Sequence, residues 1–513
     1  MSMTPPSRFA SSGAADGARV PFNPRLQSGV VAPPESLLDV SGRQKVSLHQ
    51  NIFDADFEYG LQPLRWETLA VNGGTAVALS ASGGIALTAT TAANSTVIRQ
   101  SRPYHRYQPG KSLYMATAIQ FGTQALNSFQ RVGLFDDGNG AFFEQDGTGQ
   151  IFCVIRSDVN GLPVDTRIPQ SQWNRATGLP ATVDPNSNLV LDFTAIQMLW
   201  LEYAWYGAGT IRFGVLINGV PIILHQISRG NATGAITPWS RTGNLPARYE
   251  IRHIGVTLQQ TIMHWGVSVI LEGRSDDQRG FTYTYGTAPG VRRTVPLNST
   301  RFPLLSFRMR TMGTILEANS ATSGTTTTLT RTGAGWTVNA FIGRFVLVTT
   351  ASGPRMGRIQ SNTADTLTIT DSVLGGPLDA AVTAGAYQIG YPSRGQLLPR
   401  QLIISSTSLA TVELIVNPTT LTGASFASLV SLGSPNSFAE RDVSATALVG
   451  GEVVFAFTAP AGGSGLLQLE LENLFPLFSN IRGTATDIMT LAVSTPGTAS
   501  DVAAHIICQE AMS

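Results

Sequence analysis

The sequence predicts an all-β protein made of jelly-roll-like β-sandwiches with an inserted small β-barrel. Three observations lead to this prediction. The chain of 513 residues contains 52 glycines and many Thr, Ser, Ala and Val residues, which is the composition of a β-protein with many turns. Short strand patterns recur at regular spacing between turn signals, with no convincing helix between them. The third observation is a three-strand pattern at residues 196–227, around which the other elements are arranged.

The central pattern, residues 196–227, contains three successive strands. The first covers residues 196–206, is rich in aromatic and aliphatic residues, and ends at a Gly-Ala-Gly break. The second, residues 210–217, ends at Asn218-Gly219, a pair that accepts positive φ and favours a two-residue hairpin turn. The third follows directly to the end of the stretch. Large apolar residues occur at both parities, which predicts that both faces of this meander are covered, as inside a sandwich.

The length of the chain fits two to four β-domains, and we expect four parts. They are an extended N-terminal arm (1–45), a jelly-roll or concanavalin-like β-sandwich (46–299), a C-terminal β-sandwich (300–312 with 392–513) and a small inserted β-barrel (313–391). The insertion is predicted because the sequence pattern changes to short, Thr-rich strands near residue 312 and returns to longer strands near residue 392. Insertions of this kind enter at exposed loop tips.

The predicted arm, residues 1–45, is rich in Pro, Ser, Ala and Gly, and its prolines exclude helix and most sheet pairing. It is either a disordered tail or an extended segment that becomes ordered on a neighbouring subunit, and we expect the second. Lys45 and Lys111 are the only lysines, so the residue that usually protects sheet edges is scarce. Codon bias or coverage of the edges by neighbours explains this scarcity. We expect a homo-oligomer, and a trimer before other assemblies.

Composition also excludes several classes of protein. The formal net charge is +1 and no basic stripe is present, so nucleic acid is not an expected partner. No apolar stretch approaches the ~20 residues of a membrane span, and the N-terminus lacks the apolar segment of a secretory signal. We therefore expect a soluble protein made in a cytoplasm. Cys153 and Cys508 share no metal or redox spacing, which predicts two reduced, buried thiols.

Several stretches, taken in order, resemble structural proteins of tailed-bacteriophage virions. They are residues 51–54 (NIFD), 62–66 (QPLRW), 107–112 (YQPGKS), 133–137 (GLFDD), 168–174 (IPQSQWN), the meander, 245–251 (LPARYEI), 421–424 (LTGA) and 487–493 (DIMTLAV). The inserted part is similar to a small β-module spliced into many phage proteins, on the residues Gly335, Trp336, Gly343, Arg358, Ile359 and 361–364. The resemblance covers most of the chain after residue 45.

The resemblance implies a structural protein of the virion, assembled in the cytoplasm of the bacterial host. Its partners would be capsid, neck or tail proteins, and its role would be to stabilise or decorate the particle. Two alternatives stay open. One is an appendage that binds a receptor or a host surface glycan, and the other is a tailspike that degrades polysaccharide.

A search for chemistry finds no motif for a metal or a cofactor. The six histidines show no paired spacing, and P-loop, GxSxG and dinucleotide patterns are absent, so we expect no cofactor and no metal. A glycosidase needs two carboxylates that face one cleft. Glu144 with Asp146, or Glu202 on the meander, are the candidates. We expect the first pair to be solvated residues at a hairpin end and Glu202 to be a paired structural carboxylate, so the chain is expected not to be an enzyme and to have no catalytic residue.

Two further groups allow a structural and a functional interpretation. Asp136, Asp137 and Asn139 resemble a short calcium loop, but a calcium site needs six or more oxygens, and a tight turn is favoured. The aromatic residues of the meander are either core residues or a platform for a glycan or a protein partner. They are Trp200, Tyr203, Trp205 and Tyr206. We expect core on a meander this apolar, and we keep these four residues as the candidate contacts.

Overall fold

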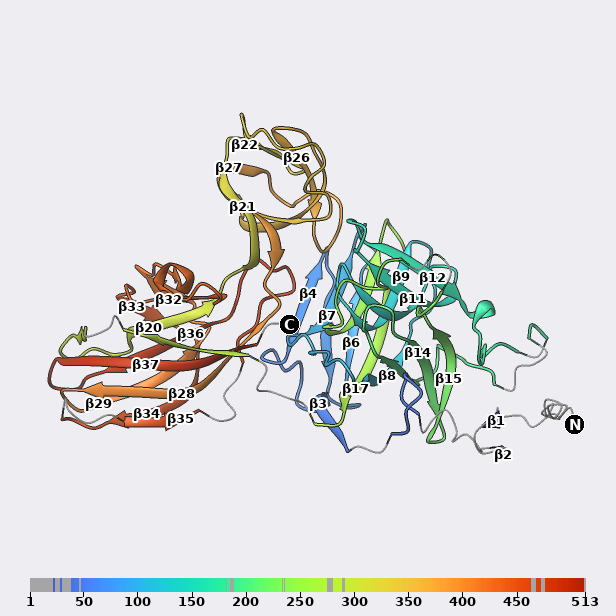
Figure 1. Cartoon of the computed structure of the whole chain (residues 1–513), viewed down its shortest axis with the longest axis horizontal. Coiled ribbons are helices and arrows are strands. Elements are labelled where there is room, and N and C mark those ends of the chain that lie inside the picture. The colour runs from blue at the N-terminus through green and yellow to red at the C-terminus, as the bar shows by residue number, and fades with distance from the viewer. Residues whose placement is uncertain are drawn as a thin grey trace, which may run out of the picture.

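The structure is a computed structural model. It describes residues 22–23, 28–29, 38–45, 48–180, 182–184, 189–232, 234, 236–274, 280–287, 291–462, 467–471 and 476–511. The prediction of an all-β fold is confirmed, because the regular elements of these residues are strands apart from two short 3-10 turns, Gln170–Gln172 and Leu429–Leu432. Nowhere in the described residues does a helix reach the length and apolarity needed to cross a membrane. Two sandwiches lie side by side, and a smaller module stands above the line where they meet (Figure 1).

The first sandwich consists of two sheets. The seven-stranded sheet has the order β12 (Val164–Pro169), β11 (Ile151–Ser157), β10 (Gly140–Gln145), β9 (Ser128–Phe135), β16 (Ala247–His253), β7 (Thr96–Ser101) and β4 (Trp66–Val71). The eight-stranded sheet has the order β15 (Val220–Ile227), β14 (Ile211–Ile217), β13 (Gln197–Tyr203), β8 (Leu113–Gln120), β17 (Gln260–Glu272), β6 (Gly84–Ala89) and β5 (Thr75–Leu79), with β3 (His49–Ala55) paired to β17. This is the predicted jelly-roll-like sandwich.

The predicted meander is β13, β14 and β15, and its hairpin turn is confirmed. Asn218 and Gly219 both have positive φ, 52° and 79°, as a two-residue turn of this kind requires. Leu199, Leu201 and Tyr203 of β13 point into the core between the two sheets. The alternate residues Trp200 and Glu202 are buried as well, so this part of β13 is covered on both faces as expected, whereas Met198 of β13 and Val220 of β15 are exposed.

The second sandwich follows the same plan. One sheet has the order β18 (Phe281–Gly286), β37 (Ser500–Ala511), β28 (Gln396–Ser406) and β35 (Leu467–Glu470), with β19 (Arg293–Val295) on β37. The other has the order β31 (Ala427–Ser428), β32 (Ala439–Asp442), β20 (Phe302–Met309), β36 (Ile488–Ser494), β29 (Ala410–Val416) and β34 (Glu452–Ala459), and a separate hairpin joins β30 (Thr420–Thr422) to β33 (Ala447–Val449).

The expected boundary at residue 299 needs a correction. Strands β18 and β19 lie before it in the sequence, yet both pair with β37 of the second sandwich. The first sandwich therefore ends with β17 at Glu272. A strand pattern shows that a segment is extended but not which strand it pairs with, and the partner here lies more than two hundred residues away.

The inserted module is one seven-stranded sheet. Its order is β21 (Met312–Ala321), β27 (Val382–Pro392), β24 (Phe345–Thr350), β25 (Gly353–Asn362), β26 (Thr366–Asp371), β23 (Thr328–Thr330) and β22 (Ser323–Gly324). The sheet rolls up so that the turn between β22 and β23 meets the start of β27, where Val382 N donates to Thr325 O at 3.1 Å and Leu378 N donates to Thr326 O at 2.8 Å. In the described residues no strand ladder joins β22 to β21, so the expected closed barrel is instead a rolled sheet.

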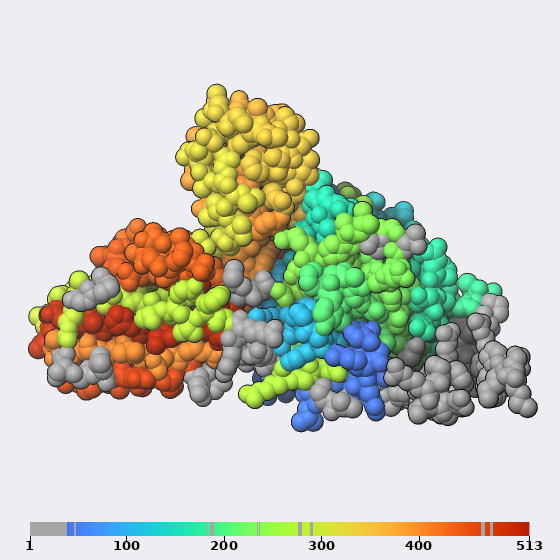
Figure 2. All heavy atoms as spheres, in the orientation of Figure 1, coloured from blue at the N-terminus to red at the C-terminus, as the bar shows by residue number. Residues whose placement is uncertain are grey.

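The module is wedged against both sandwiches and is not suspended from its host by two strands alone. Ile98 of the first sandwich, Val373 of the module and Ile481 of the second sandwich form one buried apolar cluster. Charged contacts surround it, among them Arg482 Nη1 to Asp371 Oδ2 at 2.6 Å and Arg102 Nη2 to Asp487 Oδ1 at 2.5 Å. In the space-filling view the module rises from this junction (Figure 2).

The structure describes part of the predicted N-terminal arm. Residues 38–45 lie on the first sandwich of their own chain, where Asp39 and Val40 are buried and Arg212 Nη1 donates to Leu38 O at 2.9 Å. These residues therefore contact their own chain, and docking of the arm on a neighbour stays a prediction. Upstream, β1 (Phe22–Asn23) pairs with β2 (Ser28–Gly29), and the remainder of the predicted arm lies outside the described residues.

Two smaller features complete the fold. Cys153 and Cys508 are buried and not disulfide-bonded, as predicted. The edge strand β15 is closed by the side chain of Asn174, whose Nδ2 donates to Gln226 O at 2.8 Å and whose Oδ1 accepts from Gln226 N at 2.9 Å. This amide side chain occupies the hydrogen-bonding positions that a further strand would use at Gln226.

Candidate functional site

The candidate site is a pocket of about 240 Å³ on the outer face of the eight-stranded sheet, away from the sandwich core. Strands β8, β13, β14, β15 and β17 form its floor, and the segment 38–45 forms one wall. The lining residues are Leu38, Lys45, His49, Ser112, Tyr114, Trp200, Glu202, Arg212, Leu216, Pro221, Ile223, Ile270 and Glu272. Of the residues singled out in the sequence, Trp200 and Glu202 lie here.

An aromatic pair lies on the floor of the pocket. The rings of Trp200 and Tyr114 stack with centroids 5.7 Å apart and an interplanar angle of 25°. The ring of Trp200 crosses β14 at Gly214, where an added Cβ would lie 2.1 Å from the indole, so a glycine is required at this position. Trp200 is only 5% exposed, and its Nε1 has no hydrogen-bond partner in the described part of the chain.

Two carboxylates meet at one hydroxyl group beside the aromatic pair. Ser112 Oγ lies 2.9 Å from Glu202 Oε1 and 3.2 Å from Glu272 Oε2. The two carboxylate oxygens are therefore no more than about 6 Å apart. Glu202 and Glu272 come from β13 and from the end of β17, which lie on either side of β8 in the same sheet.

Two cations face Glu202. Lys45 Nζ lies 3.0 Å from Glu202 Oε1, and Arg212 Nη1 lies 3.8 Å from Glu202 Oε2. Lys45 also stands over the ring of Tyr114, 5.9 Å from its centroid. Burial and the charge of Glu202 raise the pKa of the Tyr114 hydroxyl group, so this group stays protonated and can donate a hydrogen bond. The expectation that Glu202 is a paired carboxylate is thus correct, but the pair lies in a pocket and not in the core.

The pocket combines flat apolar surface with hydrogen-bonding groups of both kinds. The aromatic pair, Leu216, Pro221 and Ile223 offer apolar contact, while the carboxylates accept and Lys45 donates. A ligand that fits this combination carries several hydroxyl groups on an apolar ring or chain, as a carbohydrate does.

The other three aromatic residues of the predicted platform lie elsewhere. Tyr203 is in the core, where its hydroxyl group donates to Gly243 O at 2.6 Å, and Trp205 Nε1 donates to Ser240 O at 2.9 Å. Tyr206 follows β13 with a positive φ and is 58% exposed. Alternation along β13 sends Trp200 and Tyr203 to opposite faces of the sheet. The rings of Tyr203, Trp205 and Tyr206 lie 6.1–6.3 Å from the ring of Tyr107, away from Trp200.

Glu144 and Asp146 lie on the other sheet and face no common cleft with Glu202. Glu144 is buried between Arg131 and Arg167, with Nε atoms at 2.6 Å and 2.7 Å, which corrects the expectation of a solvated carboxylate. Asp146 caps a tight turn by accepting from the backbone N–H groups of Thr148 and Gln150. Both carboxylates are used by the fold.

The loop with Asp136, Asp137 and Asn139 is a turn, as favoured from the sequence. Asp136 Oδ1 accepts from the backbone N–H groups of Gly138 and Asn139, both at 2.8 Å. Asp137 pairs with Arg248 at 2.8 Å, so its carboxylate points away from that of Asp136. No group of three or more His, Cys, Asp or Glu side chains suited to a metal ion occurs within the described ranges.

Sequence reasoning missed most of the residues that complete the pocket, among them Tyr114, Ser112, Glu272 and Arg212. The sequence did contain one indication of this site: side chains alternate between the two faces of a strand, so Trp200 and Glu202 of β13 lie on the same face. Register brings the others together, since Tyr114 of β8 stands opposite both Glu202 of β13 and Ile270 of β17. Such register between distant segments is not visible in a single sequence.

Comparison with known proteins gives only distant matches. No family model matches the chain, and no curated protein matches it. A glycosyl hydrolase family protein from Mycobacterium fortuitum is similar at 12% identity and a TM-score of 0.30, over 43% of this chain and 99% of that one. The catalytic domain of an endo-1,3-beta-glucanase (laminarinase) from Thermotoga petrophila RKU-1 is 11% identical with a TM-score of 0.31, over 44% and 98%. The cellulose induced protein Cip1 is 15% identical with a TM-score of 0.26, over 42% and 96%.

These matches correct one expectation. Because they include glycosyl hydrolases and a glucanase, the prediction that the chain is not an enzyme is contradicted. With identities of 10 to 12% and TM-scores of 0.28 to 0.31, the same matches carry no argument for an activity of this chain. Any chemistry must be argued from the pocket itself.

Proposed function

We propose that the chain is a virion protein of a tailed bacteriophage, attached to capsid, neck or tail proteins, and that its first sandwich binds a carbohydrate of the host surface. The virion role rests on the ordered resemblance of residues after position 45. The carbohydrate role rests on one observation, the stacked pair Trp200 and Tyr114 beside two carboxylates that share the Ser112 hydroxyl group.

The pocket suits a sugar for physical reasons. Tyr114, the half-buried ring of the stacked pair, and the apolar residues beside it offer surface to the apolar face of a pyranose ring, and burial of that face is favourable by about 25 cal/mol per Å². Carboxylates accept strongly from hydroxyl groups, so Glu272, which is half-buried, can orient a ring at the rim. Tyr114, whose hydroxyl group stays protonated because burial and the charge of Glu202 raise its pKa, gives the same ligand a donor beside the carboxylates.

Binding is tested with oligosaccharides released from the host surface, measured by isothermal titration calorimetry on the full chain. Glu272→Gln and Tyr114→Leu are expected to weaken binding at least tenfold, a loss of about 1.4 kcal/mol. Glu440→Gln is the matched control, because Glu440 is a partly buried, ion-paired glutamate on the second sandwich. Equal affinity in all three variants, or no binding by the wild type, would contradict the proposal.

Hydrolysis of the bound glycan is a second candidate, favoured by the spacing of the carboxylates. Retaining glycosidases hold their two carboxyl groups about 5–5.5 Å apart and inverting ones about 6.5–9.5 Å apart. Because Glu202 Oε1 and Glu272 Oε2 both bond to Ser112 Oγ, they are at most about 6 Å apart, which allows the retaining spacing and excludes for these two oxygens most of the inverting range. Release of reducing ends that stops in Glu202→Gln and in Glu272→Gln is the expected result for an enzyme. Binding without release would leave the pocket as a binding site.

Membership of the particle is a separate test. The chain is expected to sediment with purified virions and to remain with them after a high-salt wash, as a homo-oligomer whose most favoured state is a trimer. A chain that stays in the soluble fraction of lysed host cells while particles form without it would contradict the virion role.

A further inference from the structure

A second cavity, of about 230 Å³, lies at the point where the three parts of the chain meet. Its walls come from the first sandwich, from the module and from the second sandwich. The polar and charged residues that line it include Asp136, Asn139, Asp158, Arg241, Asn244, Thr314, Arg358, Tyr391, Ser393 and Arg394. It is distinct from the carbohydrate pocket, which lies on the other sheet of the first sandwich.

Cations exceed anions in this junction cavity. Arg241, Arg358 and Arg394 line it, against Asp136 and Asp158. Arg394 lies over the ring of Tyr104, 4.9 Å from its centroid, and Tyr104 Oη donates to Asp136 Oδ2 at 3.3 Å. Burial raises the pKa of Asp136, but the charge of Arg394 and two backbone N–H groups lower it further, so the net shift is downward. Among the residues that line the cavity, three guanidinium groups thus face two carboxylates, and both carboxylates already accept hydrogen bonds from the protein.

The carboxylate of Asp158 accepts hydrogen bonds from three side chains, and its single negative charge cannot neutralise the two guanidinium groups among them. Its Oδ1 accepts from Asn139 Nδ2 at 2.9 Å and from Arg241 Nε at 3.0 Å. Its Oδ2 accepts from Arg358 Nη1 and Nη2 at 3.2 Å and 3.4 Å, which are long distances for a charge-assisted pair. One carboxylate thus faces two guanidinium groups from two parts of the chain.

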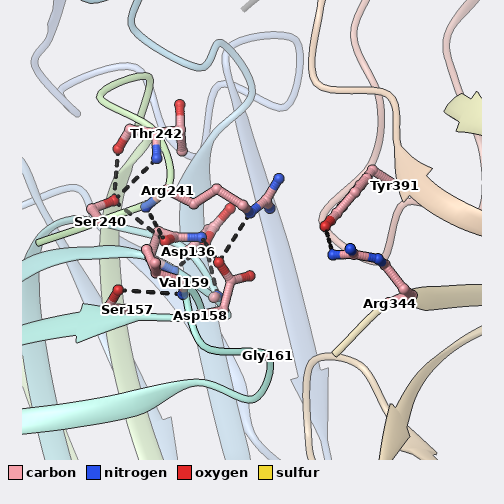
Figure 3. Close-up of polar contacts among 12 residues, drawn as sticks. Asp136, Ser157, Asp158, Val159, Gly161, Ser240, Arg241, Thr242, Arg344 and Tyr391 are labelled. Carbon is pink, nitrogen blue, oxygen red and sulfur yellow. Dashed lines mark hydrogen bonds and ion pairs between the residues drawn. The ribbon is translucent and has the colours of Figure 1, made fainter. Parts of the chain in front are cut away.

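Donor capacity remains on both arginines. Arg358 is nine-tenths buried, yet its Nε has no partner in the described part of the chain. Arg241 uses its Nε on Asp158, and no bond of its terminal nitrogens is found among the described residues. Figure 3 shows Arg241 reaching from the first sandwich toward Tyr391 and Arg344 of the module, and its guanidinium lies 4.4 Å from the centroid of the Tyr391 ring.

We propose that the junction cavity binds a small oxyanion, a phosphate or a carboxylate group, between Arg241 and Arg358. An oxyanion accepts from several guanidinium N–H groups at once, and burial strengthens these contacts because water screens them less. It would accept from the terminal nitrogens of Arg241 and face the Arg358 guanidinium, whose resident pairing with Asp158 is long. Because the two arginines belong to different parts of the chain, the bound anion would also hold the module to the first sandwich.

The site is tested on the full chain with sodium phosphate and with sodium glucuronate, each against sodium chloride at the same ionic strength. Binding is measured by calorimetry and by the shift of the melting temperature. The wild type is expected to bind one anion and to melt at a higher temperature with it. Binding of phosphate alone assigns a tetrahedral anion, and binding of both anions assigns oxyanions in general.

Two variants separate a binding site from a structural contact. Arg241→Gln is expected to weaken anion binding at least tenfold, whereas Arg301→Gln is not. The control is matched, because Arg241 and Arg301 are 41% and 43% exposed, and each pairs through Nε with one carboxylate, at 3.0 Å and 2.8 Å. Asp158→Asn removes the resident carboxylate, so phosphate is expected to raise its melting temperature more than that of the wild type.

The proposal fails if phosphate and glucuronate act on the wild type no differently from chloride. It also fails if Arg241→Gln binds the anion as well as Arg301→Gln does. Neither result would bear on carbohydrate binding, which is measured with oligosaccharides and with variants of the other pocket.

Discussion

Asp158 of the first sandwich and Arg358 of the module lie 200 residues apart in the sequence and form a buried ion pair at 3.2 Å. The pair shows that the module is part of the architecture of the whole chain, in contact with the sandwich that does not carry it. Arg358 also lies over the ring of Phe345 at 4.3 Å, so its side chain is fixed from within the module.

Replacing Arg358 by Met is expected to lower the free energy of unfolding by about 1–3 kcal/mol, because Asp158 stays buried with one cation fewer. Urea unfolding of the full chain measures the change. Arg355→Met is the control, since Arg355 pairs with the exposed Asp379 within the module and such pairs contribute about 0–1 kcal/mol. An equal loss of unfolding free energy in the two variants would show that the pair of Asp158 and Arg358 contributes no more stability than an exposed ion pair.

Replacing Gly214 by Ala is expected to disturb the carbohydrate pocket. The new Cβ would lie 2.1 Å from the indole of Trp200, so the ring must move, at a cost of about 1–3 kcal/mol. The expected readouts are a changed tryptophan emission and weaker oligosaccharide binding. Gly266→Ala on the same sheet is the control, because its Cβ would meet only Ala55 O, at an ordinary 3.5 Å. Unchanged oligosaccharide binding by Gly214→Ala would show that the position of the Trp200 ring does not matter for binding.

Buried histidines predict a loss of stability in mild acid. Burial lowers the pKa of His105 to about 3 and holds that of His264 well below 6.5. Between about pH 6.5 and pH 3 the unfolded chain therefore binds protons that the folded chain does not, so stability falls as the pH falls. Each histidine contributes up to about 1.4 kcal/mol per pH unit in this range. Thermal melts give the melting temperature of the wild type and of His264→Phe at each pH. Between pH 6 and pH 4 the melting temperature of the wild type should fall more steeply with falling pH, and identical slopes would contradict the lowered pKa of His264.

The two thiols are expected to be inert in the folded protein. Burial raises the pKa of Cys153 and of Cys508 well above the ordinary value, which suppresses the reactive thiolate. A thiol reagent at pH 8 should modify neither residue in the native chain and both in urea. Rapid labelling of either thiol under native conditions would show that the core around it opens.

Features that depend on neighbouring residues could be predicted from the sequence, whereas strand pairings between distant segments could not. The turn at Asn218 and Gly219 depends on two adjacent residues, and the structure has it as predicted. The partner of β18 depends on β37, at the other end of the chain, and the domain boundary was misplaced for that reason. The same holds for the pocket. The alternation of residues along one strand indicates the position of Glu202, but only the folded chain brings Glu272 to the hydroxyl group of Ser112 that Glu202 also contacts.

The side chain of Asn174 has a consequence for how copies of this protein can associate. A second molecule that tried to extend the eight-stranded sheet beyond β15 would find both backbone groups of Gln226 already bonded. Open-ended polymers formed by strand addition are thereby disfavoured at this edge. A contact that buries a sandwich face or a loop does not use these two backbone groups and is not hindered by Asn174.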